Sequence, residues 1–194
     1  GLVGSEMCIR DSFSSMRADL THREYSPSEL QDYIYGSAEA IGLLCLQIFL
    51  AEENVSPADR AAMERGARAL GSAFQKINFL RDLREDSSTL GRTYFQQAPS
   101  GRIDEATKSA LIAEIRRELA TAALTIDLLP ASARVGVSAA ADIFAELTNR
   151  LAATPATALA TTRVSVPNHT KAWLAARAVR RRGRSSQISP TGEN

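Results

Sequence analysis

Apolar residues recur along the chain with the spacing of one helix face, and the breaks between them carry helix-start and helix-stop residues. The sequence SPSE at 26–29 is a capping box with proline at the first helical position, which predicts a helix over about 27–52. The sequence SPAD at 56–59 repeats the start signal with an acid in the first turn, and predicts a second helix that reaches Asp86.

Three further helices are predicted downstream. Asp104 can cap a third helix that ends before Pro130, and PASARVGVSAAADIFAELTNRLAA forms a fourth that ends before Pro155. The sequence NHTKAWLAARAVRRR predicts a fifth helix after Pro167. No stretch alternates with a period of two residues, so the predicted fold class is all-α.

Composition is typical of one globular domain with a sizeable core, since 44% of the 194 residues are hydrophobic. Cys8 and Cys45 are the two cysteines, so neither a disulfide framework nor a cysteine metal site is predicted, and a reducing, cytoplasmic setting is expected. The apolar run at 40–51 is interrupted by Gln47 and is too short to span a bilayer.

The two ends of the chain differ in character from the middle. Residues 1–12, GLVGSEMCIRDS, have no helical period and no signal-peptide pattern, and are predicted to be a non-native leader. The domain is expected to cover 13–182, followed by a disordered tail at 183–194. Five arginines crowd a C-terminal stretch of the chain: Arg177, Arg180, Arg181, Arg182 and Arg184.

A row of oxygen-bearing side chains marks the end of the second predicted helix. At about 100° per residue, this row falls within an arc of roughly 100° that borders the apolar face. Its members are Gln75, Asn78, Asp82, Glu85 and Asp86.

The simplest interpretation of this row is a solvated helix face, with Arg81 and Glu85 forming an ordinary i,i+4 ion pair. Against it, the arc contains amides and acids but no base, so its carboxylates would repel one another unless a cation lies between them. Oxygen ligands without histidine or cysteine favour Mg²⁺, which in proteins commonly shares its coordination sphere with phosphate oxygens.

The chain resembles the squalene/phytoene synthase family, and within it most closely the bacterial phytoene synthases. The resemblance is carried by FSSMRADLTHREYSPSELQDYIYGSAEAIGLLCL and by LGSAFQKINFLRDLREDSSTLGRTYF, which holds the second aspartate-rich motif of the family. It is weaker in DLLPASARVGVSAAADIFAEL and TTRVSVPNHTKAW. The resemblance implies an isoprenoid-synthase-type helical bundle, incomplete at its N-terminus.

The resemblance also implies roles for individual residues. It makes Asn78, Asp82 and Asp86 ligands of Mg²⁺, with Mn²⁺ as an alternative, and Gln75 and Arg81 contacts to a prenyl diphosphate.

Arg92 and Tyr35 match two further family positions. Arg92 belongs to the G-R-x-Y element and would grip diphosphate oxygens, where an ordinary loop ion pair is the alternative. Tyr35 matches a catalytic tyrosine of the reaction cavity that would assist proton handling or stabilise a carbocation, where packing alone is the alternative. The small residues Gly36, Ser37, Ala38 and Ala40 either allow close helix packing, which is the safer interpretation, or leave room for an isoprenoid chain.

The implied reaction joins two geranylgeranyl diphosphates head to head, through a cyclopropylcarbinyl diphosphate, to phytoene. A dry apolar cavity would protect the carbocation intermediates of this reaction from water. The lipid-soluble product implies contact with a membrane periphery, and no nucleic acid partner is expected.

Three departures from the family pattern limit this assignment. The first aspartate-rich motif has no counterpart, so the 194-residue chain is expected to be nearly inactive by itself. Gln96 replaces a common proline, and four residues separate Asp86 from Gly91, one more than is usual. Phe144 occupies a position where many members carry tyrosine.

Two other functions stay open. Squalene, hydroxysqualene or dehydrosqualene synthases of the same family use the shorter farnesyl diphosphate, and the sequence does not decide the chain length. The other is a basic helical interaction module that uses the arginine cluster to bind nucleic acid or an anionic membrane surface.

Overall fold

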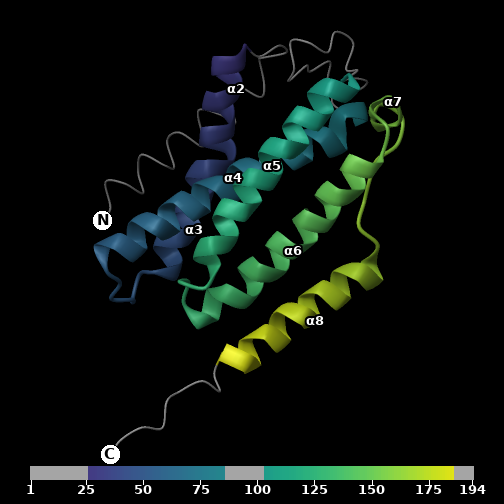
Figure 1. Ribbon diagram of the computed structural model, residues 1–194. Coiled ribbons are helices and arrows are strands. Elements are labelled where there is room, and N and C mark those ends of the chain that lie inside the picture. The colour runs from purple at the N-terminus through teal and green to yellow at the C-terminus, as the bar shows by residue number, and fades with distance from the viewer. Residues whose placement is uncertain (1–25, 86–102, 186–194) are drawn as a thin grey trace, which may run out of the picture.

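The computed structural model describes residues 26–85 and 103–185, and this part of the chain is helical without strands (Figure 1). The elements are α2 (Pro27–Ile34), the π-helical segment η1 (Tyr35–Glu39), α3 (Ala40–Phe49), α4 (Pro57–Glu85), α5 (Glu105–Ile126), α6 (Ala131–Ala153), α7 (Ala156–Leu159) and α8 (Asn168–Ser185). The predicted all-α class is confirmed. The predicted leader and the last residues of the predicted tail lie outside the described residues.

The long helix α4 organises the bundle. It packs along α5 over most of its length and also contacts η1, α3 and α6, while α8 packs on the outer side of α6 (Figure 1). The main core lies between α4, α5, α6 and α7, and its most deeply buried members include Ile77, Leu80, Ile115 and Leu151. Within α4, the core residues Ala73, Ile77 and Leu80 recur at helical spacing, as one face of an amphipathic helix requires.

The predicted helix starts are confirmed in atomic detail. Ser26 Oγ accepts a hydrogen bond from the backbone N–H of Glu29, whose carboxylate accepts one from the N–H of Ser26 at 2.8 Å. Ser56 Oγ accepts from the N–H of Asp59, and Asp104 accepts from the N–H of Thr107. Each cap pairs N–H groups that the first helical turn leaves without partners.

Two local features differ from the predicted helices. The helix expected over about 27–52 contains the π-helical segment η1 and ends at Phe49, because Leu50 leaves the helical conformation and a turn follows. The short α7 was not predicted at all. Its start is held by tertiary contacts, since the Ala156 N–H donates to Glu105 at 2.9 Å and Lys108 Nζ donates to the Thr154 carbonyl at 2.6 Å.

Within the described residues, the helices are too short or too polar to cross a bilayer. The apolar run at 40–51 begins with α3, whose Leu43 and Leu46 are buried in the bundle.

Candidate active site

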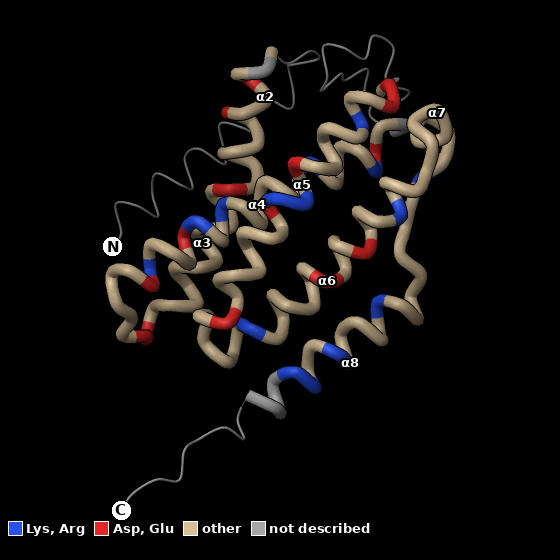
Figure 2. Tube along the Cα trace, in the orientation of Figure 1, with Lys and Arg blue, Asp and Glu red and all other residues tan. Residues whose placement is uncertain are grey.

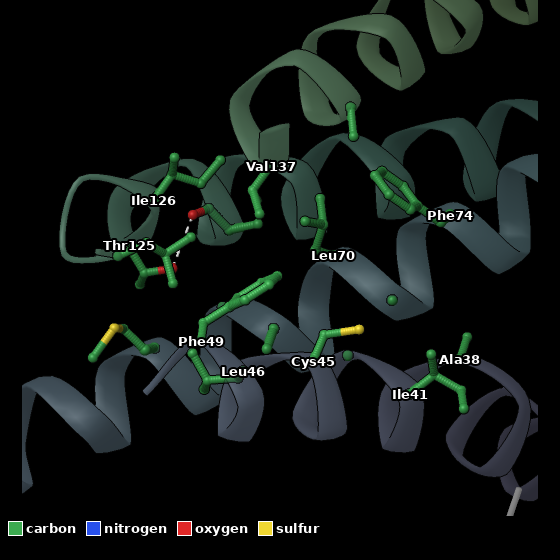
Figure 3. Close-up of a pocket in the computed structure, with 18 of the residues that line it drawn as sticks. Ala38, Ile41, Cys45, Leu46, Phe49, Leu70, Phe74, Thr125, Ile126 and Val137 are labelled. Carbon is green, nitrogen blue, oxygen red and sulfur yellow. Dashed lines mark hydrogen bonds between the residues drawn. The ribbon is translucent and has the colours of Figure 1, made fainter. Parts of the chain in front are cut away.

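An apolar cavity of about 360 Å³ opens between α3, α4, α5 and α6 (Figure 3). Phe49, Leu70 and Val137 point toward one another across it from three different helices. Its few polar lining residues include Ser37, Gln75 and Thr125, and the Thr125 hydroxyl is already bonded to the Ala122 carbonyl. The cavity therefore suits an extended hydrocarbon and offers it few competing hydrogen-bond partners.

One stripe of α4 links this cavity to the predicted polar row. The lining residues of α4 run from Met63 to Gln75 at alternating spacings of three residues and one, which corresponds to about 18 Å of helix. Asn78 and Asp82 continue the stripe at the next spacings of three and four residues. Of the described members of the polar row, Gln75 therefore lies in the cavity wall, and Asn78 and Asp82 follow it along α4.

Close helix contacts form the wall of the cavity between α3 and α4. A Cβ atom on Gly42 would lie 2.6 Å from the Ala67 carbonyl oxygen, and one on Gly71 would lie 2.5 Å from that of Ala38. Both distances are too short for a side chain, so glycine at these positions lets the backbones touch. The close-packing interpretation of the small residues is confirmed at Ala38, which also lines the cavity together with Ser37.

The polar row contains a buried oxygen without a partner. Asn78 Oδ1 is inaccessible to water and accepts no hydrogen bond from the described residues. Such an orphan acceptor is unfavourable unless a ligand or ion completes it. The oxygen donors of Asn78 and Asp82 fit a hard cation, which agrees with the predicted Mg²⁺ ligands.

Asp82 is held by two arginines. Nη2 of Arg81 lies 2.5 Å from Asp82 Oδ2, and Nη2 of Arg163 lies 3.2 Å from Asp82 Oδ1. Arg81, for which a diphosphate contact was predicted, thus lies against a member of the polar row. Asp86, Arg92 and the side chain of Glu85 lie outside the described residues, and the described residues alone contain no cluster of three acids, histidines or cysteines that could hold a metal.

Arg163 was missed by reasoning from the sequence. It follows α7 in the chain and reaches the end of α4, although its side chain remains 59% exposed. The only signal was its place in the block TTRVSVPNHTKAW, where the resemblance is weak. Helix periodicity could not have found it, because Arg163 belongs to an irregular link whose path depends on tertiary packing.

Tyr35 lies beside the cavity wall and is half-buried. The structure brings its neighbours Ser37 and Ala38, and not Tyr35 itself, into the described lining of the cavity. The Arg68 guanidinium sits 5.4 Å from the centre of the Tyr35 ring and 3.8 Å from the Glu39 carboxylate. Burial raises the pKa of Glu39 above its ordinary value, and the charge of Arg68 partly opposes this shift.

Phe144 replaces the tyrosine common in the family and packs on α4. Its ring is stacked on that of Phe74, with centroids 3.8 Å apart and an angle of 20° between the planes. Since Phe74 lines the cavity, this pair joins α4 and α6 at the cavity wall.

A buried charge cluster fixes the opposite face of α4 against α5. Lys76 Nζ lies 2.7 Å from Glu114 and 2.6 Å from Glu118, and Ser72 Oγ donates to Glu118 at 2.8 Å. Burial lowers the pKa of Lys76, but the hydrogen bonds to the two glutamates outweigh it, so the net pKa is raised. The cluster orients the neighbouring Gln75 toward the cavity by fixing the rotation of α4.

Comparison with known proteins identifies the family. A family model described as squalene/phytoene synthase matches residues 5–170. Phytoene synthase 3 of Zea mays is 42% identical over 93 residues, which cover 46% of this chain and 21% of the relative. Phytoene synthase 1 of Solanum lycopersicum is 37% identical over 104 residues, covering 50% of this chain and 24% of the relative.

A fungal relative extends the match along more of the chain. The bifunctional lycopene cyclase/phytoene synthase of Blakeslea trispora is 26% identical over 157 residues, covering 72% of this chain and 26% of the relative. The chain thus spans only about a quarter of the length of these relatives. Because the family match covers most of its residues, the chain belongs to the squalene/phytoene synthase family.

Proposed function

We propose that this chain carries one side of the active site of a phytoene synthase, which joins two geranylgeranyl diphosphates head to head. The observation that supports the proposal is a stripe of α4 whose residues up to Gln75 line an apolar cavity and which continues to Asn78 and Asp82. A prenyl diphosphate has the same two parts, a polar head and a long hydrocarbon. The names of the relatives, all phytoene synthases in whole or in part, favour the C40 product.

Two kinds of residue would bind the diphosphate head group: hydrogen-bond donors and Mg²⁺ ligands. Gln75 and the guanidinium groups of Arg81 and Arg163 would donate hydrogen bonds to diphosphate oxygens, while Asn78 and Asp82 would hold Mg²⁺ together with Asp86. When bound, Mg²⁺ supplies positive charge that stabilises the departing diphosphate. The apolar lining orients the hydrocarbon and excludes water from the reacting carbons.

Binding tests the proposal directly in this chain. Titration calorimetry should show geranylgeranyl diphosphate binding that requires Mg²⁺ and disappears in the double variant Asp82→Ala/Asp86→Ala. A Glu64→Ala variant is the matched control, because Glu64 is an exposed acid on the same helix. Equal binding by the double variant would remove the proposed role of this site.

Chain length separates the proposal from its nearest alternative. The squalene, hydroxysqualene and dehydrosqualene synthases would prefer farnesyl diphosphate, so the same titration with both substrates distinguishes the two. Tighter binding of the farnesyl compound would favour the alternative. Binding is a better readout than turnover, because we expect the 194 residues to lack the first aspartate-rich motif and to have little activity alone.

A further inference from the structure

The outer face of α8 combines positive charge with exposed apolar side chains. Trp173 is 54% exposed and Val179 is 58% exposed, and Arg180 lies on the same side of the helix. With Ala172 and Ala176, these residues fall within an arc of about 120°. Among the described elements, α8 packs mainly on α6 (Figure 1), and the residues of this arc are all exposed.

The inner face of α8 already has its partners. Leu174 and Ala178 are buried, and Arg177 and Arg181 both pair with Asp142 of α6, at 2.9 and 3.3 Å. These contacts hold α8 against α6, whereas Val179 and Arg180 are exposed and lie outside them.

Charge is distributed very unevenly along the chain. Residues 147–192 contain eight lysines and arginines and no aspartate or glutamate, whereas the whole chain has a net charge of +1. The rest of the chain is consequently acidic overall. On α8 every charged residue that Figure 2 colours is basic, while the other long helices carry charges of both signs.

We propose that α8 docks the protein on the surface of a membrane rich in anionic lipids. Tryptophan is favoured at the boundary between head groups and acyl chains, and exposed bases beside it are attracted to anionic head groups. Val179 would enter the same boundary layer, with Arg180 directed to the phosphates. No residue of α8 lines the cavity, so the docking surface goes beyond the proposed enzymatic function and does not depend on it.

A nucleic acid fits this surface less well than a membrane does. Phosphate-backbone binding uses charge and has no need of an exposed valine. Base stacking on Trp173 would be limited to one face of its ring, because the Arg177 guanidinium lies over the other, 5.0 Å from the ring centre.

Trp173 supplies its own reporter, because it is the only tryptophan in the chain. The 194-residue protein is mixed with vesicles of phosphatidylcholine alone, or of phosphatidylcholine and phosphatidylserine at about two to one. We expect co-sedimentation and a blue shift of the tryptophan emission with the anionic vesicles only. Raising the salt concentration should weaken the binding.

Four variants locate the contact. Arg180→Glu should weaken vesicle binding about tenfold or more, because each base near an anionic surface strengthens binding about fivefold. Val179→Ala should weaken it while keeping the fluorescence reporter. Arg117→Glu and Leu124→Ala make the same kinds of change at exposed positions of α5 and should leave vesicle binding unchanged.

Three results would overturn the proposal. One is the absence of both co-sedimentation and a blue shift with anionic vesicles. The second is an equal loss of binding in Arg117→Glu, which would indicate a diffuse charge effect. The third is salt-sensitive binding to duplex DNA that competes with vesicles and is stronger, which would make a nucleic acid the partner. None of these results bears on prenyl diphosphate binding, so failure here is distinguishable from failure of the proposed function.

Discussion

Nη2 of Arg163 lies 3.2 Å from Oδ1 of Asp82, and this contact ties the link between α7 and α8 to the end of α4. Asp82 also forms an ion pair with the Arg81 guanidinium, so two bases pair with one carboxylate near the end of α4. The Arg163 side chain is 59% exposed and has room to turn. An anionic ligand arriving with Mg²⁺ would compete for both the carboxylate and the bases.

Arg163→Ala should weaken Mg²⁺-dependent binding of geranylgeranyl diphosphate about tenfold, because a charge-assisted hydrogen bond to the head group is lost. Arg163→Lys should restore part of the affinity, since it keeps the charge without the fork geometry. Titration calorimetry measures both. Arg65→Ala, an exposed base on α4, is the control and should bind normally. Unchanged affinity in Arg163→Ala would show that Arg163 serves only to neutralise Asp82.

Cys45 allows the cavity to be probed chemically. It lines the cavity, and its thiol is not in a disulfide. In a Cys8→Ser background, N-ethylmaleimide should modify Cys45, and geranylgeranyl diphosphate with Mg²⁺ should slow this reaction about tenfold when the hydrocarbon covers the thiol. Mass spectrometry of the intact protein follows the rate. Inorganic diphosphate with Mg²⁺ is the control ligand, and equal protection by it would place the hydrocarbon elsewhere.

The sequence predicted the helices best where local chemistry decides the structure. Caps at Ser26, Ser56 and Asp104 depend on side chains within three residues of the backbone they bind, and all three were predicted. The π-helical segment η1 was not predicted. It lies where Gly71 of α4 approaches the Ala38 carbonyl, and no local pattern encodes such a contact.

The candidate site divides in the same way. Gln75, Asn78 and Asp82 lie on one helix, so spacing alone predicted that they share a face. The position of Arg163 depends on the path of a link between two helices, and the place of Tyr35 beside the cavity depends on how η1 meets α4. Both positions depend on tertiary packing, which the periodicity of the sequence does not predict.

Lys76→Ala should lower the free energy of unfolding by about 2 to 3 kcal/mol, because it leaves two glutamates facing a buried surface without their cation. The upper end of the usual range is not expected, since Glu114 is 46% exposed and keeps part of its hydration. Urea titration at neutral pH measures the change. Arg150→Ala breaks the more exposed pair with Glu146 and should cost less than about 1 kcal/mol. If both variants lowered the free energy of unfolding equally, Lys76 would be no more buried in solution than Arg150.

The cluster of Lys76 with its two glutamates also predicts that the free energy of unfolding falls at alkaline pH. The pKa of Lys76 is raised above its ordinary value of 10.5, so the folded state holds this proton more tightly than the unfolded state. The stabilisation is therefore fully present below 10.5 and is lost as the pH rises through the folded pKa. The unfolding curves of the wild type and of a Lys76→Met variant should converge in that alkaline range. A gap that stays constant would assign the loss to packing and not to charge.

Gly71→Ala should both destabilise the fold and weaken ligand binding, because its Cβ would lie 2.5 Å from the Ala38 carbonyl oxygen. The obstacle is backbone, so η1 must move away from α4, at about 1 to 3 kcal/mol. Gly136→Ala is the matched control: the position is exposed within α6 and nothing lies within 4 Å of its added Cβ. It should stabilise the protein by about 0.5 to 1 kcal/mol through helix propensity. Thermal unfolding and prenyl diphosphate titration of the two variants separate the outcomes. Since Gly71 and Ser37 both line the cavity, a shift of η1 changes its shape as well as its stability. If Gly71→Ala behaved like Gly136→Ala, the close contact between η1 and α4 would not exist in solution.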